Sequence, residues 1–187
     1  EGRIFAKING ILEPAIVQAL YRASQAGVRI DLICRGICSL RPNVPGVSDN
    51  IRIISIVDRF LEHSRIYYFG NDGDPEVYIG SADWMDRNLS RRVEVVFPIE
   101  TPELKQRLIR EILATSLADN TKARLLLPDG TYERIHPIDA QRRVRSQACF
   151  LEMALQNAAR SLPEAPPPVP FVEQRPTPRR HRKRQTS

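Results

Sequence analysis

A histidine and several polar groups flank two short segments that are expected to be neighbouring strands. His63 and Arg65 lead into the first segment, and the Gly80–Asp83 turn, followed by Arg87 and Asn88, comes after the second. An imidazole can act as a nucleophile or general acid near neutral pH, and a guanidinium binds phosphate oxygens bidentately. A Gly-Ser turn adds N–H and O–H donors. These residue types in this order point to phosphoryl chemistry.

Hydrophobic alternation and turn residues predict the elements that must position these groups. A strand over residues 3–9, a helix from Pro14 to about Ala26 and a strand over residues 28–34 form a right-handed βαβ unit with a parallel strand pair. The fold class is therefore α/β, with a mixed β-sheet flanked by helices. The further elements expected are strands at 51–56, 65–69, 76–79 and 92–99, a helical turn at 57–62, a helix from Thr101 to about Leu117 with Leu104, Leu108, Ile112 and Leu113 inward, a hairpin of 124–127 with 132–135, and helix-prone sequence over 139–161.

A long loop rich in Gly, Pro, Ser and Asn follows the strand at 28–34 and runs from Arg35 to Asn50. Ligands of open α/β sheets bind beyond the carboxyl ends of the strands, which is where this loop begins. Arg35 is therefore a candidate phosphate ligand.

The charge of the chain is concentrated at its C-terminal end. The net charge is +6, and residues 161–187 hold six Lys or Arg against two Glu, which leaves only +2 for residues 1–160. Seven prolines lie in the same terminal stretch. Such a composition predicts a disordered tail rather than a packed element. The high isoelectric point is thus no evidence that the folded part binds nucleic acid.

Other compositional features limit the class of protein. No apolar run is long enough to span a membrane, the first residues do not resemble a signal peptide, and the absence of an initiator Met suggests a fragment. Three cysteines, Cys34, Cys38 and Cys149, form neither a disulfide framework nor a zinc site. We expect a reducing compartment, buried free thiols and no metal ligands in this chain.

The sequence around His63 resembles the polyphosphate kinase family. The order of His63, Arg65, Ser81 and Asp83 is similar to the phospholipase D motif H-x-K followed by G-S-x-N, with Arg65 in the Lys position and Asp83 near the Asn position. Asp58 is one departure, since the family pattern has Gly there. Longer ordered matches, which cover about residues 1–137, are Ala6–Asn9, Leu20–Tyr21, Ala23–Ser24, Arg35–Cys38, Ser48–Ile51, Ser55–Val57, Arg59–His63, Gly80–Met85 and Arg91–Glu94.

The resemblance implies a reaction and a set of site residues. The family reversibly extends a phosphate polymer from the γ-phosphate of ATP through a phosphohistidine, in a four-domain enzyme whose last two domains are similar to the halves of phospholipase D. By position, His63 is the second-half catalytic histidine and also meets the substrate, Arg35 meets the ATP phosphates, and Arg65 is a further phosphate-binding candidate. The phosphorylated histidine and the arginines associated with Mg²⁺ belong to the preceding domain. The isolated fragment is therefore expected to be inactive.

The resemblance and the composition together divide the chain into three parts. Residues 1–137 are expected to be the polyphosphate kinase C-terminal catalytic domain, 138–161 a helical extension and 162–187 a disordered Pro/Arg-rich basic tail. The expected partners are ATP or ADP, inorganic polyphosphate and the upstream domains, in a homo-oligomer when complete, with no specific nucleic acid. The expected location is cytoplasmic, with peripheral attachment to the inner membrane as an alternative.

Two other functions stay open. The chain could be a phospholipase D-like phosphodiesterase half-site that dimerises around two copies of His63, or a non-catalytic polyanion-binding module driven by the basic tail.

Several charged, polar or apolar residues also have interpretations that involve no function. His136 suits a surface position, and Lys7 suits a structural or solvated charge. Arg65, Arg87, Arg91 and Arg92 could form ion pairs with Asp83, Asp86 and Glu94, while Trp84 and Met85 suit the core.

Overall fold

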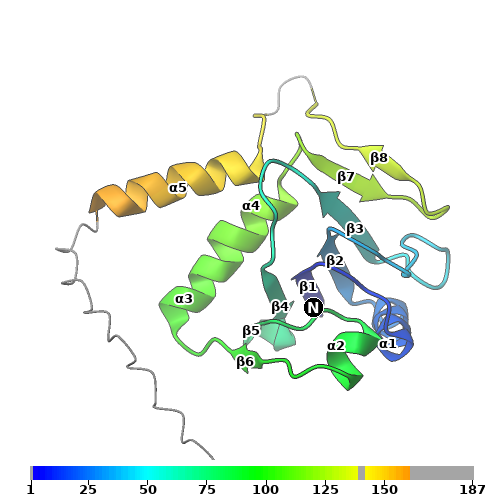
Figure 1. The fold of residues 1–187 in the computed structure, drawn as a ribbon. Coiled ribbons are helices and arrows are strands. Elements are labelled where there is room, and N and C mark those ends of the chain that lie inside the picture. Colours follow the sequence, from blue (N-terminus) through cyan, green and yellow to red (C-terminus); the bar gives the residue numbers. More distant parts are fainter. Residues whose placement is uncertain (1, 139–141, 161–187) are drawn as a thin grey trace, which may run out of the picture.

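The computed structural model describes residues 2–138 and 142–160 (Figure 1). The predicted tail at 162–187 lies outside these residues. The described part confirms the predicted α/β class, because eight strands form one mixed sheet in the order β6-β5-β4-β1-β2-β3-β7-β8. The strands are β1 (Arg3–Ile8), β2 (Arg29–Cys34), β3 (Ile51–Ile56), β4 (Arg65–Phe69), β5 (Glu76–Gly80), β6 (Val96–Pro98), β7 (Ala123–Leu126) and β8 (Tyr132–Arg134).

The three central strands are parallel, so the chain crosses over twice, through a helix between β1 and β2 and through the loop of residues 35–50 between β2 and β3. β1 pairs with β2, and β2 pairs with β3, in parallel register. Helix α1 (Pro14–Gln25) joins β1 to β2, with Pro14 in its first turn, where no intrahelical N–H is lost. Gly27 follows the helix at a φ of +86°, which favours glycine, and ends it as predicted.

The outer strands are antiparallel, and this brings distant segments to one edge. β4 pairs antiparallel with β1, β5 with β4, and β7 with β3. The start of β4, the end of β5 and the start of β7 therefore lie at the edge where β1, β2 and β3 end. We call this edge of the sheet the carboxyl edge. His63 precedes β4, Arg35 follows β2, and Ser81 follows β5, so all three predicted positions meet there.

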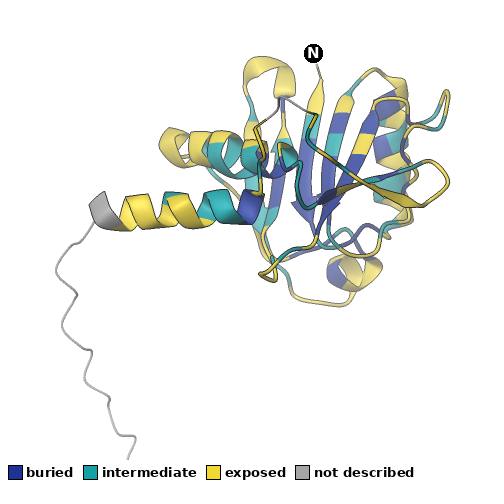
Figure 2. Cartoon of the chain, turned by 90° about the horizontal axis from the view of Figure 1, so that it is seen from above, coloured by how far each residue is buried: buried dark blue, intermediate teal, exposed yellow. Residues whose placement is uncertain are grey.

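Helices cover both faces of the sheet (Figure 2). One core cluster joins the inner strands to α1, with Ile8, Leu32 and Ile53 almost fully buried. The opposite face packs against a continuous helical stretch formed by α3 (Pro102–Arg107), a π-helical segment (Leu108–Leu113) and α4 (Ala114–Leu117). Burial of apolar side chains on both faces explains why the inner strands read as apolar runs.

Three local predictions were wrong. Residues 57–62 contain no helical turn and form an extended loop instead, which is held by side chains from beyond residue 144. The strand predicted over 92–99 is reduced to Val96–Pro98, and Val93 is fully exposed. Leu104 is half exposed because it lies in the first turns of α3, ahead of the segment that packs on the sheet, whereas Leu113 is buried as predicted.

The remaining helices lie outside the sheet layers. Helix α5 (Ser146–Arg160) occupies the predicted helical extension and points away from the body (Figures 1 and 2). A short helix, α2 (Asp86–Ser90), follows the turn after β5. None of the helices in the described ranges combines the length and the hydrophobicity that a membrane span requires.

Candidate active site at the carboxyl edge

A chain of polar contacts joins three of the strands at the carboxyl edge. Arg65 at the start of β4 donates to Asp83 through Nη2 at 2.9 Å and through Nε at 3.3 Å. Asp83 also accepts a 2.7 Å hydrogen bond from the backbone N–H of Asn9, directly after β1. The side-chain oxygen of Asn9 in turn accepts from Nε and Nη2 of Arg35, at 3.2 and 3.0 Å. The structure thus brings Arg35 and Arg65 to one polar row.

The two arginines of this row differ in their electrostatics. Asp83 is 2% exposed. Burial raises the pKa of its carboxyl, but the hydrogen bonds from Arg65 and Asn9 outweigh burial and bring that pKa below its usual value. The same pair raises the pKa of Arg65. Arg35 is held by a neutral amide and forms no ion pair among the described residues. Its charge is therefore available to an anion, whereas that of Arg65 is already balanced.

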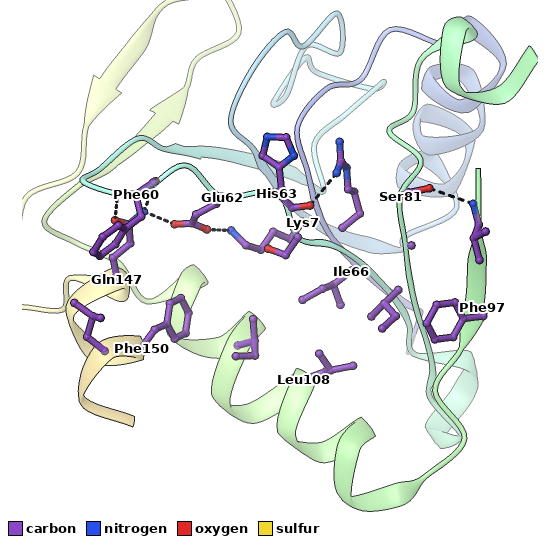
Figure 3. Close-up of a pocket in the computed structure, with 17 residues that line it drawn as sticks. Lys7, Phe60, Glu62, His63, Ile66, Ser81, Phe97, Leu108, Gln147 and Phe150 are labelled. Carbon is purple, nitrogen blue, oxygen red and sulfur yellow. Dashed lines mark hydrogen bonds and ion pairs between the residues drawn. The ribbon is translucent and has the colours of Figure 1, made fainter. Parts of the chain in front are cut away.

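His63 lies at the rim of a large pocket, which has a volume of about 870 Å³. Its side chain is exposed, and its backbone carbonyl accepts a 2.9 Å hydrogen bond from Nη1 of Arg65. Figure 3 shows the imidazole above the apolar wall of the pocket, pointing away from Ile66 and Leu108. The ring is therefore accessible to a substrate at the edge. That wall also includes Ile79, Val95, Phe97, Ile112, Phe150 and Leu151, and it offers no group that could bind phosphate.

The loop that carries His63, residues 57–64, is held in place by a largely buried network of charged and polar side chains. Lys7, 6% exposed on β1, pairs with Glu62, the residue before His63. Gln147 in the first turn of α5 donates to the other oxygen of Glu62 at 2.7 Å and to the carbonyl of Phe60 at 2.9 Å, and it accepts from the Phe60 N–H at 2.8 Å. Lys7 is thus a structural charge, which was one of the two interpretations that the sequence allowed, and not a solvated one.

A second contact holds the beginning of the same loop. Arg145 donates two hydrogen bonds of 2.7 Å to the two carboxylate oxygens of Asp58, which lowers the pKa of that carboxyl. Asp58 is the position at which the sequence departs from the family pattern. Neither this pair nor Gln147 was found by sequence reasoning, because their partners are more than 80 positions away. The signal that could have indicated the network was a lysine inside an otherwise apolar strand.

Glu94 closes the site on the side of β5. Its carboxylate accepts hydrogen bonds from Ser81 and, at 2.6 Å, from Asn88, and these bonds lower its pKa. The hydroxyl of Ser81 also accepts from the N–H of Val95 at 3.1 Å. The Ser81 N–H also donates to the Val95 carbonyl at 2.9 Å, and together these contacts hold residues 94–95 ahead of β6, which begins only at Val96. Ser81 thus contributes to the site mainly by fixing Glu94.

The burial of other residues named in the sequence analysis can also be compared with expectation. Cys34 is a buried free thiol as predicted, and Cys38 is a half-buried one. Met85 is buried and Trp84 packs against the core, also as predicted. His136 is exposed beyond the β7–β8 hairpin, and Arg91 forms a surface pair with Asp86 at 3.1 Å.

The described residues do not fit a resident Mg²⁺. No group of three or more His, Cys, Asp or Glu side chains gathers in a metal-binding arrangement within residues 2–138 and 142–160. The buried or half-buried carboxylates of Asp58, Glu62, Asp83 and Asp119 are each occupied by cations or by N–H and O–H donors. These carboxylates therefore leave no open set of ligands for Mg²⁺ among the described residues.

An α/β domain that gathers a histidine and two arginines beyond its parallel strands presents groups that suit an anionic ligand. The chain belongs to the polyphosphate kinase family, since the model of the polyphosphate kinase C-terminal domain 2 matches residues 1–147. That match includes Arg145 and Gln147. The family resemblance seen in the sequence is thus confirmed.

Individual relatives agree with this assignment. The chain is 58% identical over 154 residues to a polyphosphate kinase of Synechocystis and 56% identical over 149 residues to one of Pseudomonas aeruginosa. These matches cover 82% and 80% of this chain but 21% of each relative, so the chain spans about a fifth of their length. The crystal structure of the polyphosphate kinase from Porphyromonas gingivalis superposes with a TM-score of 0.81 at 42% identity, over 86% of this chain and 24% of that one.

Proposed function

We propose that this chain is the C-terminal part of a polyphosphate kinase and supplies phosphate-binding groups for reversible transfer of the ATP γ-phosphate onto inorganic polyphosphate. One observation carries the proposal. Arg35, whose charge is balanced by no carboxylate in the described residues, lies on the same edge as the exposed imidazole of His63, in a chain that belongs to this family.

The transfer takes place in two successive phosphoryl-transfer steps. A histidine nitrogen of the preceding domain forms a bond to the γ-phosphorus while the bond to the β-phosphate oxygen breaks and ADP leaves. A terminal oxygen of polyphosphate then displaces the histidine and receives the phosphoryl group. Neither step requires an oxidant or a reductant, and each runs backwards when ADP is in excess. The nucleophile and the Mg²⁺ ligands are proposed to lie outside this chain.

Arg35 is proposed to bind the phosphates of ATP. Its guanidinium is oriented by Asn9 through two of its nitrogens, at 3.2 and 3.0 Å, so little side-chain freedom is lost when a phosphate binds. In phosphoryl transfer most of the rate enhancement comes from positioning and from stabilising charge on the phosphate oxygens. Arg35 provides both in one group.

His63 is proposed to donate a proton or a hydrogen bond to the transferring group. Its exposed ring and its backbone bond to Arg65 suit this role. Arg65 is proposed to position His63, because its Nε and both terminal nitrogens already contact Asp83 or the His63 carbonyl. A direct contact between Arg65 and phosphate stays a prediction.

The test uses the complete enzyme with its upstream domains. Arg35→Ala should lower the rate of polyphosphate synthesis about 10²- to 10³-fold, as expected for the loss of one preorganised donor. His63→Ala should be at least as damaging. His63→Gln separates two roles, since an amide can hydrogen-bond but cannot exchange a proton near pH 7. If His63→Gln is as slow as His63→Ala, the residue moves a proton.

His136→Ala is the matched control, because His136 is exposed and lies outside the polar row. This variant should retain normal activity. The proposal is wrong if His136 proves essential and His63 does not. The phospholipase D-like alternative would be favoured instead if the chain, without its upstream domains, hydrolysed a chromogenic phosphodiester in a His63-dependent manner.

A further inference from the structure

A second and smaller pocket adjoins Arg35 on the side away from His63. It has a volume of about 310 Å³. Its far wall is formed by the β7–β8 hairpin, which contributes Arg124 and Tyr132. The residues that line it are Arg35, Gly36, Ser55, Val57, Arg124 and Tyr132. Unlike the large pocket, this one therefore has a guanidinium on each of two sides.

One face of the hairpin carries two arginines, Arg124 and Arg134, that form no ion pair among the described residues. Arg124 lies directly opposite Ser55 on β3 and directly opposite Arg134 on β8. Like charges in opposite positions of an antiparallel pair are destabilising. Among the described residues neither Arg124 nor Arg134 forms an ion pair, and Arg134 donates to the carbonyl of Thr121 at 3.1 Å. Folding alone does not explain this placement of two arginines, whereas an anion would.

The positions of Arg35 and Arg124 leave room for an anion that contacts both side chains. Arg35 follows β2 and Arg124 lies on β7, with β3 between them. Neighbouring strands lie about 4.8 Å apart, so the two backbones are separated by about 10 Å. In the order of strands β4-β1-β2-β3-β7, Arg35 follows the middle strand, His63 precedes β4 on one side and Arg124 lies on β7 on the other.

We infer that Arg124 and Tyr132 bind a linear phosphoanhydride chain that continues from the phosphate held by Arg35. This inference rests on the proposed role of Arg35 and adds a path for the rest of the substrate. Arg124 supplies a second guanidinium, and Tyr132 supplies a hydroxyl donor. Burial raises the pKa of Tyr132, so its phenol stays protonated and able to donate at neutral pH.

The test follows binding of inorganic tripolyphosphate to the isotopically labelled 187-residue chain by NMR, through the backbone amide of Gly36. Arg124→Gln should weaken this binding about tenfold, as expected for one charge-assisted contact. Tripolyphosphate binding should also become less dependent on salt concentration, because one charge–charge contact is lost. The matched control is Arg29→Gln, because Arg29 is an exposed arginine at the opposite end of β2 and should leave binding unchanged. All variants share the same basic C-terminal sequence, so its contribution cancels.

Further ligands identify the anion. If inorganic phosphate is held by Arg35 alone, its affinity should be the same in Arg124→Gln and in the unmodified chain. A larger loss for tripolyphosphate than for ADP would identify the polymer as the ligand, and the reverse would identify the nucleotide. Equal losses for inorganic phosphate and tripolyphosphate would contradict the inference, and so would the absence of tripolyphosphate binding.

The result also separates this inference from the proposed function. If Arg35→Ala abolishes binding while Arg124→Gln behaves like Arg29→Gln, the extended path is wrong and the role of Arg35 stands. If Arg35→Ala binds normally while Arg124→Gln is weakened, the proposed role of Arg35 is wrong. Unchanged amide shifts outside the pocket will show that each variant is folded.

Discussion

Gln147 and Glu62 are joined by a 2.7 Å hydrogen bond, which links the first turn of α5 to the residue directly before His63. The two residues are 85 positions apart in the sequence. Lys7 pairs with the other carboxylate oxygen of Glu62, so the loop is fixed between the central strand β1 and a helix that lies outside the sheet layers. The position of His63 therefore depends on sequence beyond the predicted domain boundary at residue 137.

Gln147→Ala should loosen the His63 loop without unfolding the domain. The change removes three hydrogen bonds to Phe60 and Glu62 and leaves Glu62 with Lys7 alone. Amide hydrogen exchange of residues 60–63 should become about tenfold faster, which corresponds to one hydrogen bond of about 1.4 kcal/mol. Gln156→Ala is the control, because Gln156 is an exposed glutamine on the same helix. Equal exchange rates in the two variants would show that α5 does not hold the loop.

Asp119→Asn should destabilise the domain by about 2–4 kcal/mol, measured by urea unfolding at pH 7. Asp119 is 1% exposed and accepts hydrogen bonds from the N–H groups of Thr121, Lys122, Ala123 and Ser146 and from the Ser146 hydroxyl, at 2.7–3.1 Å. An amide would direct an N–H group at some of these donors. Asp74→Asn, at an exposed turn, should leave stability nearly unchanged.

The same residue gives the unfolding free energy a definite pH dependence. Burial raises the pKa of Asp119, but the hydrogen bonds from the backbone and from Ser146 outweigh it, and the folded-state value lies below the usual one. Its stabilising contribution is therefore complete above the unfolded pKa of about 3.9 and is lost as pH falls towards the folded value. Between pH 5 and pH 3 the original chain should lose stability more steeply than Asp119→Asn. Parallel curves would mean that Asp119 titrates alike in both states.

Arg65→Lys should reduce stability by about 1–2 kcal/mol in the same urea assay. Arg65 contacts both oxygens of Asp83 and also the His63 carbonyl, whereas an ammonium is a point charge that cannot reproduce this planar arrangement. Arg87→Lys is the control, since Arg87 is exposed on α2. If Arg65→Lys is as stable as the control, the geometry of the guanidinium does not matter for folding.

The 187-residue chain, incubated with ATP and magnesium, should form no acid-labile phosphoprotein. Phosphoenzyme formation needs a positioned nucleophile, and the family resemblance assigns that histidine to the preceding domain. The measurement is phosphate transfer from γ-labelled ATP, with the complete enzyme as the positive control. Stoichiometric labelling of His63 would instead support the phospholipase D-like half-site.

Local patterns in the sequence were sufficient to predict most of the elements. Alternating apolar residues indicated β1, strand-like segments indicated β2 and β4, and Pro14 and Gly27 marked the two ends of α1. The dense ordered motifs around His63 indicated the family, which the comparisons confirm. All of these signals lie within a few residues of the feature that they predict, because they reflect backbone propensity and side-chain periodicity.

Tertiary structure decided which polar groups meet. Arg65 and Asp83 are 18 positions apart, and only antiparallel pairing of β4 with β5 makes them an ion pair. Glu62 and Gln147 needed the return of the chain after β8, and Arg124 reached the pocket of Arg35 only because β7 pairs with β3. Sequence periodicity states which face of a strand a residue occupies but not which strand lies beside it. The order of strands results from burying both faces of one sheet, and that order placed Arg65 next to Asp83 and Arg124 next to the pocket of Arg35.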